Sequence, residues 1–320
     1  MKIFRHHDDF PEELKGSVIA IGNFDGVHLG HMGVIGEARR IAEANDIPWG
    51  VMTFEPHPRA YFQPDQPAFR ITPLRAKSHA VAPLGADFLI SLRFDKLLAT
   101  MSAEDFVQSV LMDNLSIHHI VCGYDFTFGA ARGGDCELLL HMGKELGFGM
   151  TAVGAISDDS GTAYSSTRIR EALVDGDLQL VANLLGRPYE IAGRVQHGDK
   201  LGRTIGYPTA NIHMEDYMEP ARGIYAVRAA LDVPESLDSP VWIDGAANLG
   251  IRPMFETENP VLEVYLFDFE GDLYDQHMRV QILEFIRPEI KFGSLDELVQ
   301  AIEVDCIKVR EFLAQYKDRG

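Results

Sequence analysis

The stretch from Gly22 to His31 holds the residue types best suited to chemistry in this chain of 320 residues. It reads Gly-Asn-Phe-Asp-Gly-Val-His-Leu-Gly-His, follows an apolar run, and precedes a segment with helical spacing of apolar residues. Glycines let a backbone approach a phosphate closely, and the N–H groups at a helix start bind anions. Two histidines add donors that can stabilise the charge growing on an α-phosphate during in-line attack. The predicted nucleotide loop comprises Gly22, Asn23, Phe24, Asp25 and Gly30, with His28 and His31 as its catalytic side chains.

Two other interpretations of these histidines stay open. They could serve only to begin the helix, or they could bind zinc in an H-x-x-H arrangement. His57 is a conceivable third zinc ligand, but no cysteine or carboxylate completes a recognisable pattern. The sequence G-x-x-x-x-G-K-[ST] is absent, so this loop is not a P-loop.

The elements around the loop predict a parallel sheet. Between residues 17 and 149, short apolar runs alternate with longer segments of helical periodicity. The predicted strands are 17–21, 49–54, 87–90 and 119–122. The predicted helices are 32–44, 74–82, 103–112 and 136–146. This alternation is typical of a doubly wound α/β domain, whose binding crevice lies beyond the carboxyl ends of its strands.

The second half of the chain has a different pattern of predicted elements. After short helices predicted over 167–175 and 178–185, the tripeptide Gly186-Arg187-Pro188 ends the helical pattern. We therefore expect one domain over residues 1–186 and another over 187–320. The second domain is predicted to be a small antiparallel β-barrel with a final amphipathic helix near 295–316. Its predicted strands are 189–196, 223–230, 241–247, 261–267 and 278–286.

Composition restricts the partners and the compartment. The formal charge of −19 repels a phosphate backbone and no basic run overrides it, so nucleic acid is not an expected partner. No apolar stretch approaches the roughly 20 residues that span a bilayer, and the N-terminus lacks a signal-peptide core. We expect a cytoplasmic protein without a membrane partner, in which Cys122, Cys136 and Cys306 are reduced thiols. The oligomeric state is not indicated by any of these features.

A glycine-rich stretch in the second domain is another phosphate-loop candidate. Gly198 and Gly202 precede the sequence Pro-Thr-Ala-Asn at residues 208–211, which we interpret as a polar turn. By spacing alone, this stretch is equally typical of an ordinary turn between barrel strands.

Four motifs follow one another along the first domain. They are residues 22–31, Met-Thr-Phe-Glu-Pro-His-Pro-Arg at 52–59, Gly-Tyr-Asp-Phe-Thr-Phe-Gly at 123–129, and Ser-Ser-Thr-Arg-Ile-Arg at 165–170. In this order they resemble the prokaryotic riboflavin kinase/FMN adenylyltransferase family, a branch of the nucleotidyltransferase superfamily. The resemblance implies a Rossmann-like first domain that transfers AMP from ATP onto FMN to give FAD, with Mg²⁺ and without a covalent enzyme intermediate. Because FMN already carries an ionised phosphate, such catalysis rests on alignment and charge stabilisation.

The resemblance also implies roles for other residues of the first domain. Arg168 would neutralise the β- and γ-phosphates of ATP and assist the departure of pyrophosphate. His57 and Asp125 are candidate flavin-binding residues, although His57 could be structural and Asp125 could be a turn residue. The resemblance implies that Ser165, Ser166 and Thr167 bind the nucleotide at a helix start. These residues could instead serve only to cap the helix.

The stretch 193–211 resembles the riboflavin kinase signature, whose Pro-Thr-Ala-Asn sequence holds Mg-ATP. The resemblance implies that Thr209 and Asn211 are Mg²⁺ ligands, in keeping with the preference of Mg²⁺ for hard oxygen atoms. Glu263 is the candidate base for the terminal hydroxyl of riboflavin, although an ordinary edge carboxylate stays open. The implied ATP-binding residues are Gly198, Gly202 and Thr209, and the implied flavin-binding residues are Arg287, Glu289 and Phe292.

Met254 departs from the family pattern. After the sequence N-x-G-x-x-P at residues 248–253, the family usually has a threonine, so a hydroxyl is replaced by a flexible apolar side chain. This difference motivates an alternative, an FMN adenylyltransferase whose barrel binds flavin without kinase turnover. A third interpretation is an adenylyltransferase for a pantetheine or nicotinamide nucleotide, against which the attached barrel argues.

Overall fold

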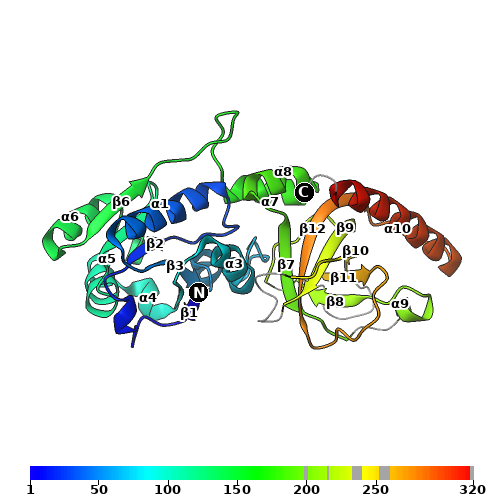
Figure 1. The fold of residues 1–320 in the computed structure, drawn as a ribbon, viewed down its shortest axis with the longest axis horizontal. Coiled ribbons are helices and arrows are strands. Elements are labelled where there is room, and N and C mark those ends of the chain that lie inside the picture. The colour runs from blue at the N-terminus through cyan, green and yellow to red at the C-terminus, as the bar shows by residue number, and fades with distance from the viewer. Residues whose placement is uncertain (198–200, 215, 233–239, 252–259, 318–320) are drawn as a thin grey trace. The chain divides into compact units, whose positions relative to one another are not determined.

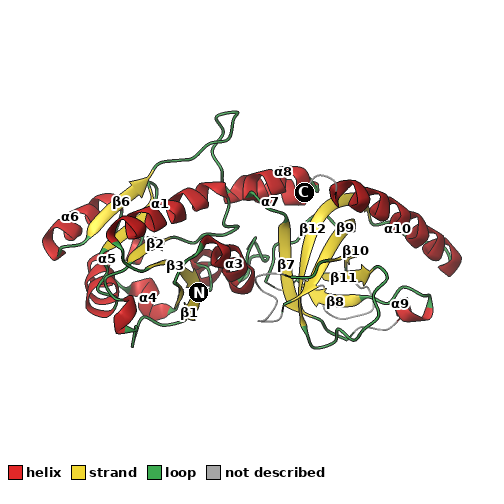
Figure 2. Cartoon of the chain, viewed as in Figure 1, coloured by secondary structure: helices red, strands yellow, loops and turns green. Residues whose placement is uncertain are grey.

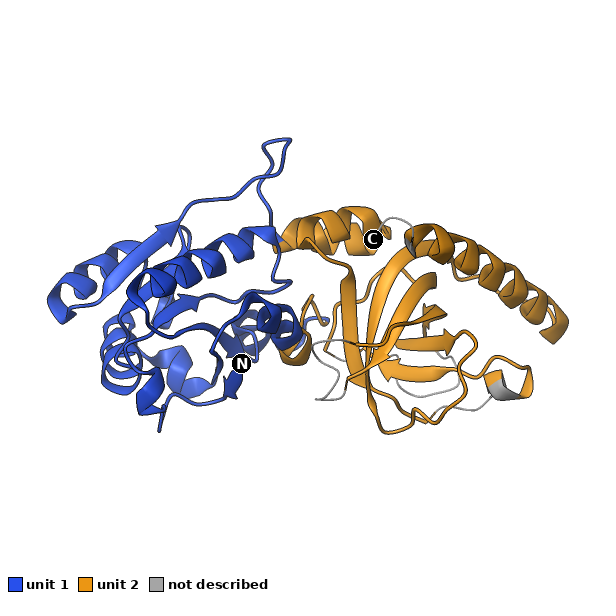
Figure 3. Cartoon of the chain, viewed as in Figure 1, with its two compact units in different colours: residues 1–67, 77–165 blue, residues 68–76, 166–320 orange. Residues whose placement is uncertain are grey.

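The computed structural model describes residues 1–197, 201–214, 216–232, 240–251 and 260–317. The chain forms two compact units, Met1–Pro67 with Lys77–Ser165, and Ala68–Ala76 with Ser166–Gly320 (Figures 1 and 3). Gly198 and Met254 lie outside the described residues. Among the residues that are described, no helix is long and apolar enough to cross a membrane.

The first unit contains a six-stranded sheet in the order β1-β4-β3-β2-β5-β6. All neighbouring strands run parallel, which confirms the predicted doubly wound sheet. The four predicted strands correspond to β2 to β5, whereas the short β1 and the mostly half-buried β6 were not predicted, because neither is a continuous apolar run. The strands are β1 (Lys2–Phe4), β2 (Val18–Ile21), β3 (Trp49–Glu55), β4 (Phe88–Arg93), β5 (His119–Gly123) and β6 (Gly149–Val153).

Helices cover this sheet and enclose its core (Figure 2). One cluster joins Ile19, Ile21 and Met52 of the sheet to Phe106 and Val107. The alternate side chains of these strands point to the other face of the sheet. Helix α1 covers that face and contacts β2, β3 and β5. The α-helices are α1 (Leu29–Asn45), α2 (Pro58–Phe62), α3 (Leu74–Val81), α4 (Lys96–Thr100), α5 (Ala103–Asp105) and α6 (Cys136–Leu146). Short 3₁₀ turns cover Glu12–Leu14, Ala82–Leu84 and Ala130–Arg132.

The helix predicted over residues 103–112 differs in its winding. Only α5 is α-helical, and Phe106–Asn114 forms a π-helix. A π-helix joins backbone groups five residues apart, as in the hydrogen bond from Leu115 N to Val110 O at 3.2 Å. Two side-chain hydrogen bonds have the same span: Gln108 Nε2 to Asp113 Oδ1 at 2.8 Å and Asn114 Nδ2 to Ser109 O at 2.6 Å. Apolar periodicity does not distinguish this winding from the α-helix that we predicted.

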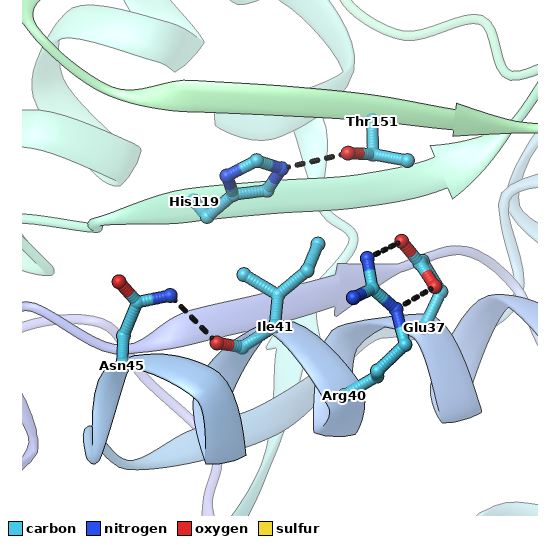
Figure 4. Close-up of polar contacts among 6 residues, drawn as sticks. All are labelled: Glu37, Arg40, Ile41, Asn45, His119 and Thr151. Carbon is cyan, nitrogen blue, oxygen red and sulfur yellow. Dashed lines mark hydrogen bonds and ion pairs between the residues drawn. The ribbon is translucent and has the colours of Figure 1, made fainter.

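His119 joins the last two strands of the sheet (Figure 4). Its Nε2 atom is 2.9 Å from Thr151 Oγ1, and its ring covers Gly149, where a Cβ would fall 2.1 Å from Nδ1. On α1, Figure 4 shows the ion pair between Glu37 and Arg40, in which Nη2 and Oε1 are 2.7 Å apart. Burial lowers the pKa of His119 below its ordinary value, with a further decrease from His118 and an opposing increase from Glu37.

We expect this pKa to make His119 a source of acid sensitivity. Because the folded pKa lies below the unfolded value, the neutral ring stabilises the fold above about pH 6.5, and this contribution is lost as the pH falls through the folded pKa. The variant His119→Gln cannot titrate, so its deficit in melting temperature relative to the wild type should shrink as the pH is lowered from about 8 to about 5. Thermal unfolding followed by circular dichroism measures this difference. A deficit that stays constant over this range would contradict the assignment.

The second unit contains the predicted antiparallel barrel. Its strand order is β7-β12-β9-β10-β11-β8, and every pairing is antiparallel. The two edges approach each other where Gln196 pairs with Asn211, so the barrel is nearly closed. The strands are β7 (Tyr189–Arg194), β8 (Ala210–His213), β9 (Gly223–Leu231), β10 (Ile243–Gly250), β11 (Val261–Leu266) and β12 (His277–Pro288). The helices are α7 (Ser166–Asp175), α8 (Leu178–Leu185), α9 (Leu201–Thr204) and α10 (Leu295–Lys317).

Two sequence interpretations of this unit need comment. The Pro-Thr-Ala-Asn sequence is only partly a turn, because Ala210 and Asn211 already pair with β11 as part of β8. The predicted helix stop is confirmed, since Gly186 ends α8 with φ of 71°. The compact units divide at Ser165, because α8 packs on β7 and β12, while residue 186 stays our proposed domain boundary because the barrel strands begin after it.

Candidate active sites

The loop between β2 and α1 lies at the switch point of the parallel sheet. β2 is flanked by β3 and β5, and the chain runs outward from β2 in one direction before it returns to build the other side. In such sheets, ligands bind beyond the carboxyl ends of the strands at this point. The predicted nucleotide loop follows β2 directly, so its position agrees with the predicted crevice.

His28 and His31 lie together at the start of α1. The His28 Nδ1 atom accepts a hydrogen bond from the His31 backbone N–H, with an N···N distance of 3.2 Å. The two rings stack with centroids 3.6 Å apart, and Phe24 meets His31 edge-on at 5.4 Å. Because Nδ1 accepts, the proton of a neutral His28 ring is on Nε2, which leaves Nε2 as a donor. His28 therefore does begin the helix, and this role is compatible with binding a phosphate.

Gly30 is required by this arrangement. A Cβ at Gly30 would lie 3.0 Å from His28 Cε1 and 3.2 Å from Tyr164 Cβ. A side chain at this position would therefore require the His28 ring or Tyr164 to shift by a few tenths of an ångström. The glycine thus serves the histidine pair directly.

The loop is held in an unusual backbone conformation. Phe24 and Val27 have φ angles of 46° and 45°, in the left-handed region that a β-branched residue such as valine rarely adopts. Both side chains are buried, with exposed fractions of 2% and 1%, and Asp25 between them is 3% exposed. Strain of this kind persists where the surroundings determine the backbone and is concentrated at functional sites.

His57 and Asp125 follow the two strands that flank β2. Both therefore lie at the same edge of the sheet as the nucleotide loop. His57 Nδ1 accepts a hydrogen bond from Arg59 N at 3.1 Å and begins α2, which is a structural role. Asp125 is exposed in a turn that is closed by a hydrogen bond from Phe126 N to Gly123 O, with an N···O distance of 3.1 Å. Contacts of His57 and Asp125 with flavin stay proposals.

The zinc interpretation of the histidines gains no support. Within the described part of the chain, no group of three or more His, Cys, Asp or Glu side chains could hold a metal ion.

The helix start at Ser166 agrees with the predicted capping segment, since Ser165 directly precedes the first turn of α7. Ser166, Thr167 and Arg168 belong to the second compact unit, and their action on the nucleotide stays a proposal.

Three neighbouring strands of the barrel build the second site. The β8–β11 register places Asn211 opposite Glu263, and the β11–β10 register places Asn248 opposite the same glutamate. Directly opposed residues project from one face with Cβ atoms about 4.5–5.5 Å apart. Asn211 is 4% exposed, while Glu263 and Asn248 are half-buried. The predicted Mg²⁺ ligand and the predicted base are thus neighbours, and Asn248, noted in the sequence only as part of a motif, joins them.

Aromatic side chains continue this face of the barrel. Tyr265 lies two residues after Glu263 and contacts the ring of Phe267 at 5.7 Å and that of Tyr207 at 5.3 Å. Burial raises the pKa of Tyr265 above its ordinary value. Tyr265 and Phe267 belong to an apolar cluster that also includes Val309 of α10. Helix α10 lies along β9, β10 and β12 (Figure 1). The row of polar side chains therefore lies beside an aromatic surface under α10.

The backbone before β8 approaches residue 202 so closely that only a glycine fits there. Tyr207 N donates a hydrogen bond to Gly202 O at 2.7 Å, and a Cβ at Gly202 would lie 2.3 Å from Tyr207 O. The same Cβ position is 3.7 Å from Thr209 Oγ1, so Gly202 lies close to the predicted Mg²⁺ ligand. Gly202 is needed for this close approach, and its contact with ATP stays a proposal.

The three flavin-binding residues that were predicted in the second domain have different surroundings. Arg287 forms a two-pronged ion pair with Asp305 of α10, with Nε–Oδ1 and Nη2–Oδ2 distances of 2.9 and 2.6 Å. Asp305 is 4% exposed, so the observed contacts of Arg287 attach α10 to the barrel. The Glu289 carboxylate packs on Gly250, where a Cβ would fall 2.0 Å from Oε1, and Phe292 lies half-buried after β12.

Two family models match the two halves of the chain. Residues 10–168 match the family model described as FAD synthetase, and residues 185–313 match the model described as riboflavin kinase. The first match includes the histidine pair, and the second includes Asn211, Asn248 and Glu263. The fold and the two sites thus define a nucleotidyltransferase domain joined to a riboflavin kinase barrel.

Relatives match nearly the whole chain. The bifunctional riboflavin kinase/FMN adenylyltransferase of Escherichia coli K12 is 40% identical over 318 residues, with 99% of each chain covered. The protein of the same name from Bacillus subtilis is 39% identical over 306 residues, with 93% of each covered. A crystal structure described as a macrolide-efflux protein from Streptococcus pneumoniae has a TM-score of 0.79 and 30% identity, covering 96% of this chain and 98% of its own. The chain belongs to the bifunctional riboflavin kinase/FMN adenylyltransferase family.

Proposed function

We propose that this chain phosphorylates riboflavin to FMN in its barrel and transfers AMP from ATP to FMN in its first unit, giving FAD and pyrophosphate. The observation that carries this proposal is the separation of two sets of functional groups. His28 and His31 belong to one compact unit, while Asn211 and Glu263 belong to the other. Two sites with different chemistry support two reactions rather than one reaction and a passive binding module.

In the first reaction, an oxygen of the FMN phosphate attacks the α-phosphorus of ATP, and the bond from this phosphorus to the pyrophosphate oxygen breaks. His28 Nε2 and the His31 ring donate hydrogen bonds to the α-phosphate as its charge grows. Arg168 neutralises the departing pyrophosphate, and the hydroxyl groups of the preceding residues bind the nucleotide. The nucleophile belongs to the substrate, so alignment and charge stabilisation supply most of the catalysis.

In the second reaction, the terminal hydroxyl of riboflavin attacks the γ-phosphorus of ATP, the bond from this phosphorus to the bridging oxygen breaks, and ADP leaves. Glu263 accepts the hydroxyl proton as the new bond forms, and the neighbouring Asn211 and Thr209 hold Mg-ATP. The donor set fits Mg²⁺, because the row next to Glu263 offers hard oxygen atoms and the ion usually shares its shell with phosphates and water. When bound, Mg²⁺ neutralises phosphate charge.

Further assignments complete the proposal. Flavin contacts are proposed for His57 and Asp125 in the first unit and for Arg287, Glu289 and Phe292 at and beyond the end of β12. Gly202 approaches ATP through its backbone. The cytoplasm is the proposed compartment, because both reactions consume ATP, and the charge of −19 makes nucleic acids poor partners.

A chromatographic time course tests the two activities. With riboflavin, ATP and Mg²⁺, FMN should appear first and FAD after a lag, whereas FAD should form without a lag from supplied FMN. Chelation of Mg²⁺ with EDTA should stop both reactions. If FAD forms only from supplied FMN, the barrel is a binding module and Met254→Thr is the variant to make. If neither flavin reacts, the assignment of the acceptor is wrong.

A further inference from the structure

Lys77 is a buried lysine beneath the nucleotide loop. It lies on α3 and is only 3% exposed, although a lysine is seldom fully buried unless its charge is compensated. It lies outside the four motifs of the first domain. Its environment therefore indicates a specific function for the ammonium group.

The Lys77 ammonium meets the loop at one carbonyl oxygen. Nζ donates to Asn23 O at 2.6 Å and to Thr53 Oγ1 at 2.9 Å, and Thr53 Oγ1 donates to Asn23 O at 3.0 Å. Thr53 belongs to β3 and is 1% exposed. Because a carbonyl oxygen has two lone pairs, it can accept both hydrogen bonds. The loop, β3 and α3 are thus fixed to one another at Asn23 O.

This anchor determines the direction of the next peptide group. In a trans peptide the C=O and the following N–H point in opposite directions, so Asn23 O held by Lys77 directs Phe24 N–H away from α3. Phe24, the next residue, and Val27 further along the loop both have left-handed φ angles, and such strained residues need surroundings that fix them. The triangle formed by Lys77, Thr53 and Asn23 supplies part of this constraint.

We propose that Lys77 is a positioning residue of the adenylyl-transfer site. Its ammonium fixes the Asn23 peptide, so that the loop presents its donors to the phosphates of ATP with a positive charge behind them. This inference rests on the proposed nucleotide site at residues 22–31. It assigns no contact between Lys77 and the substrate.

The variant Lys77→Met removes the charge and keeps most of the volume. We expect the KM for ATP in FAD formation to rise roughly 10-fold to 100-fold, the range for losing hydrogen bonds to a charged group. The KM for FMN and the phosphorylation of riboflavin should stay within about twofold of the wild type. Loss of folded molecules would lower kcat without changing KM, so the KM for ATP separates positioning from mere destabilisation. Lys96→Met, at an exposed lysine of α4, is the matched control.

A second pair of variants tests the same triangle if Lys77→Met does not fold. Thr53→Val removes the hydroxyl and should raise the KM for ATP, while Thr53→Ser keeps the hydroxyl and should restore nearly the wild-type value. An unchanged KM for ATP in folded Lys77→Met, or equal values for the two Thr53 variants, would overturn the inference. Unimpaired FAD formation by His31→Ala would instead overturn the underlying nucleotide site.

Discussion

Replacing His31 with alanine should lower the rate of FAD formation from FMN by roughly 100-fold to 1,000-fold, the usual cost of removing one transition-state donor. The His31 ring stacks on that of His28 at 3.6 Å, so the variant also removes the support of the second donor. Riboflavin phosphorylation should be unchanged, because Asn211 and Glu263 belong to the other compact unit. Both rates are measured on one preparation by chromatography of the flavins.

The control for this variant is His141→Ala, which removes an exposed histidine from α6 of the same unit. It should leave both reactions within about twofold of the wild type. Retention of full FAD formation by His31→Ala would remove the histidine pair from the mechanism. Loss of both activities in a folded His31→Ala variant would contradict the assignment of two separate sites.

Replacing Glu263 with glutamine should reduce riboflavin phosphorylation by roughly 100-fold to 10,000-fold, the range for losing a general base. Glutamine keeps the shape of the side chain opposite Asn211 and Asn248 but cannot accept the hydroxyl proton at neutral pH. FAD formation from supplied FMN should be unaffected. Initial rates with riboflavin and with FMN, measured separately, check both statements.

Glu270→Gln is the matched control, since Glu270 is an exposed carboxylate shortly after β11. It should leave the kinase rate within about twofold of the wild type. Equal kinase rates for Glu263→Gln and the wild type would make Glu263 an ordinary strand carboxylate. In that case another group must accept the hydroxyl proton.

Local sequence patterns were sufficient for the central strands of the first sheet and for the prediction of the nucleotide loop. The apolar runs that became β2 to β5 are buried on both faces, which gives a continuous apolar signal that can be read without knowing any partner strand. The nucleotide loop was predicted because His28, Gly30 and His31 are close in sequence and lie within the first turn of one helix. Their mutual geometry is therefore almost entirely local.

The contacts between distant segments could not be predicted in this way. Lys77 lies 54 residues from Asn23, and nothing in the pattern of α3 indicates that its ammonium is buried against that carbonyl oxygen. Arg287 matched a flavin-binding motif, yet its guanidinium is paired with Asp305 on α10. Partners of this kind depend on how separate elements pack, which residue spacing does not encode.

The sequence by itself predicted two domains with different patterns of strands and helices, a nucleotide loop at a strand end, and a carboxylate on a barrel strand. The two-residue period of side chains along a strand predicted that Glu263 and Tyr265 share a face, because this period is a property of one strand alone. Only the tertiary structure decided that Asn211 and Asn248 flank Glu263, since this row depends on the registers of three strands. A shift of one residue in either register would turn the facing side chains to the opposite face, so long-range pairing brings together the residues of the proposed kinase site.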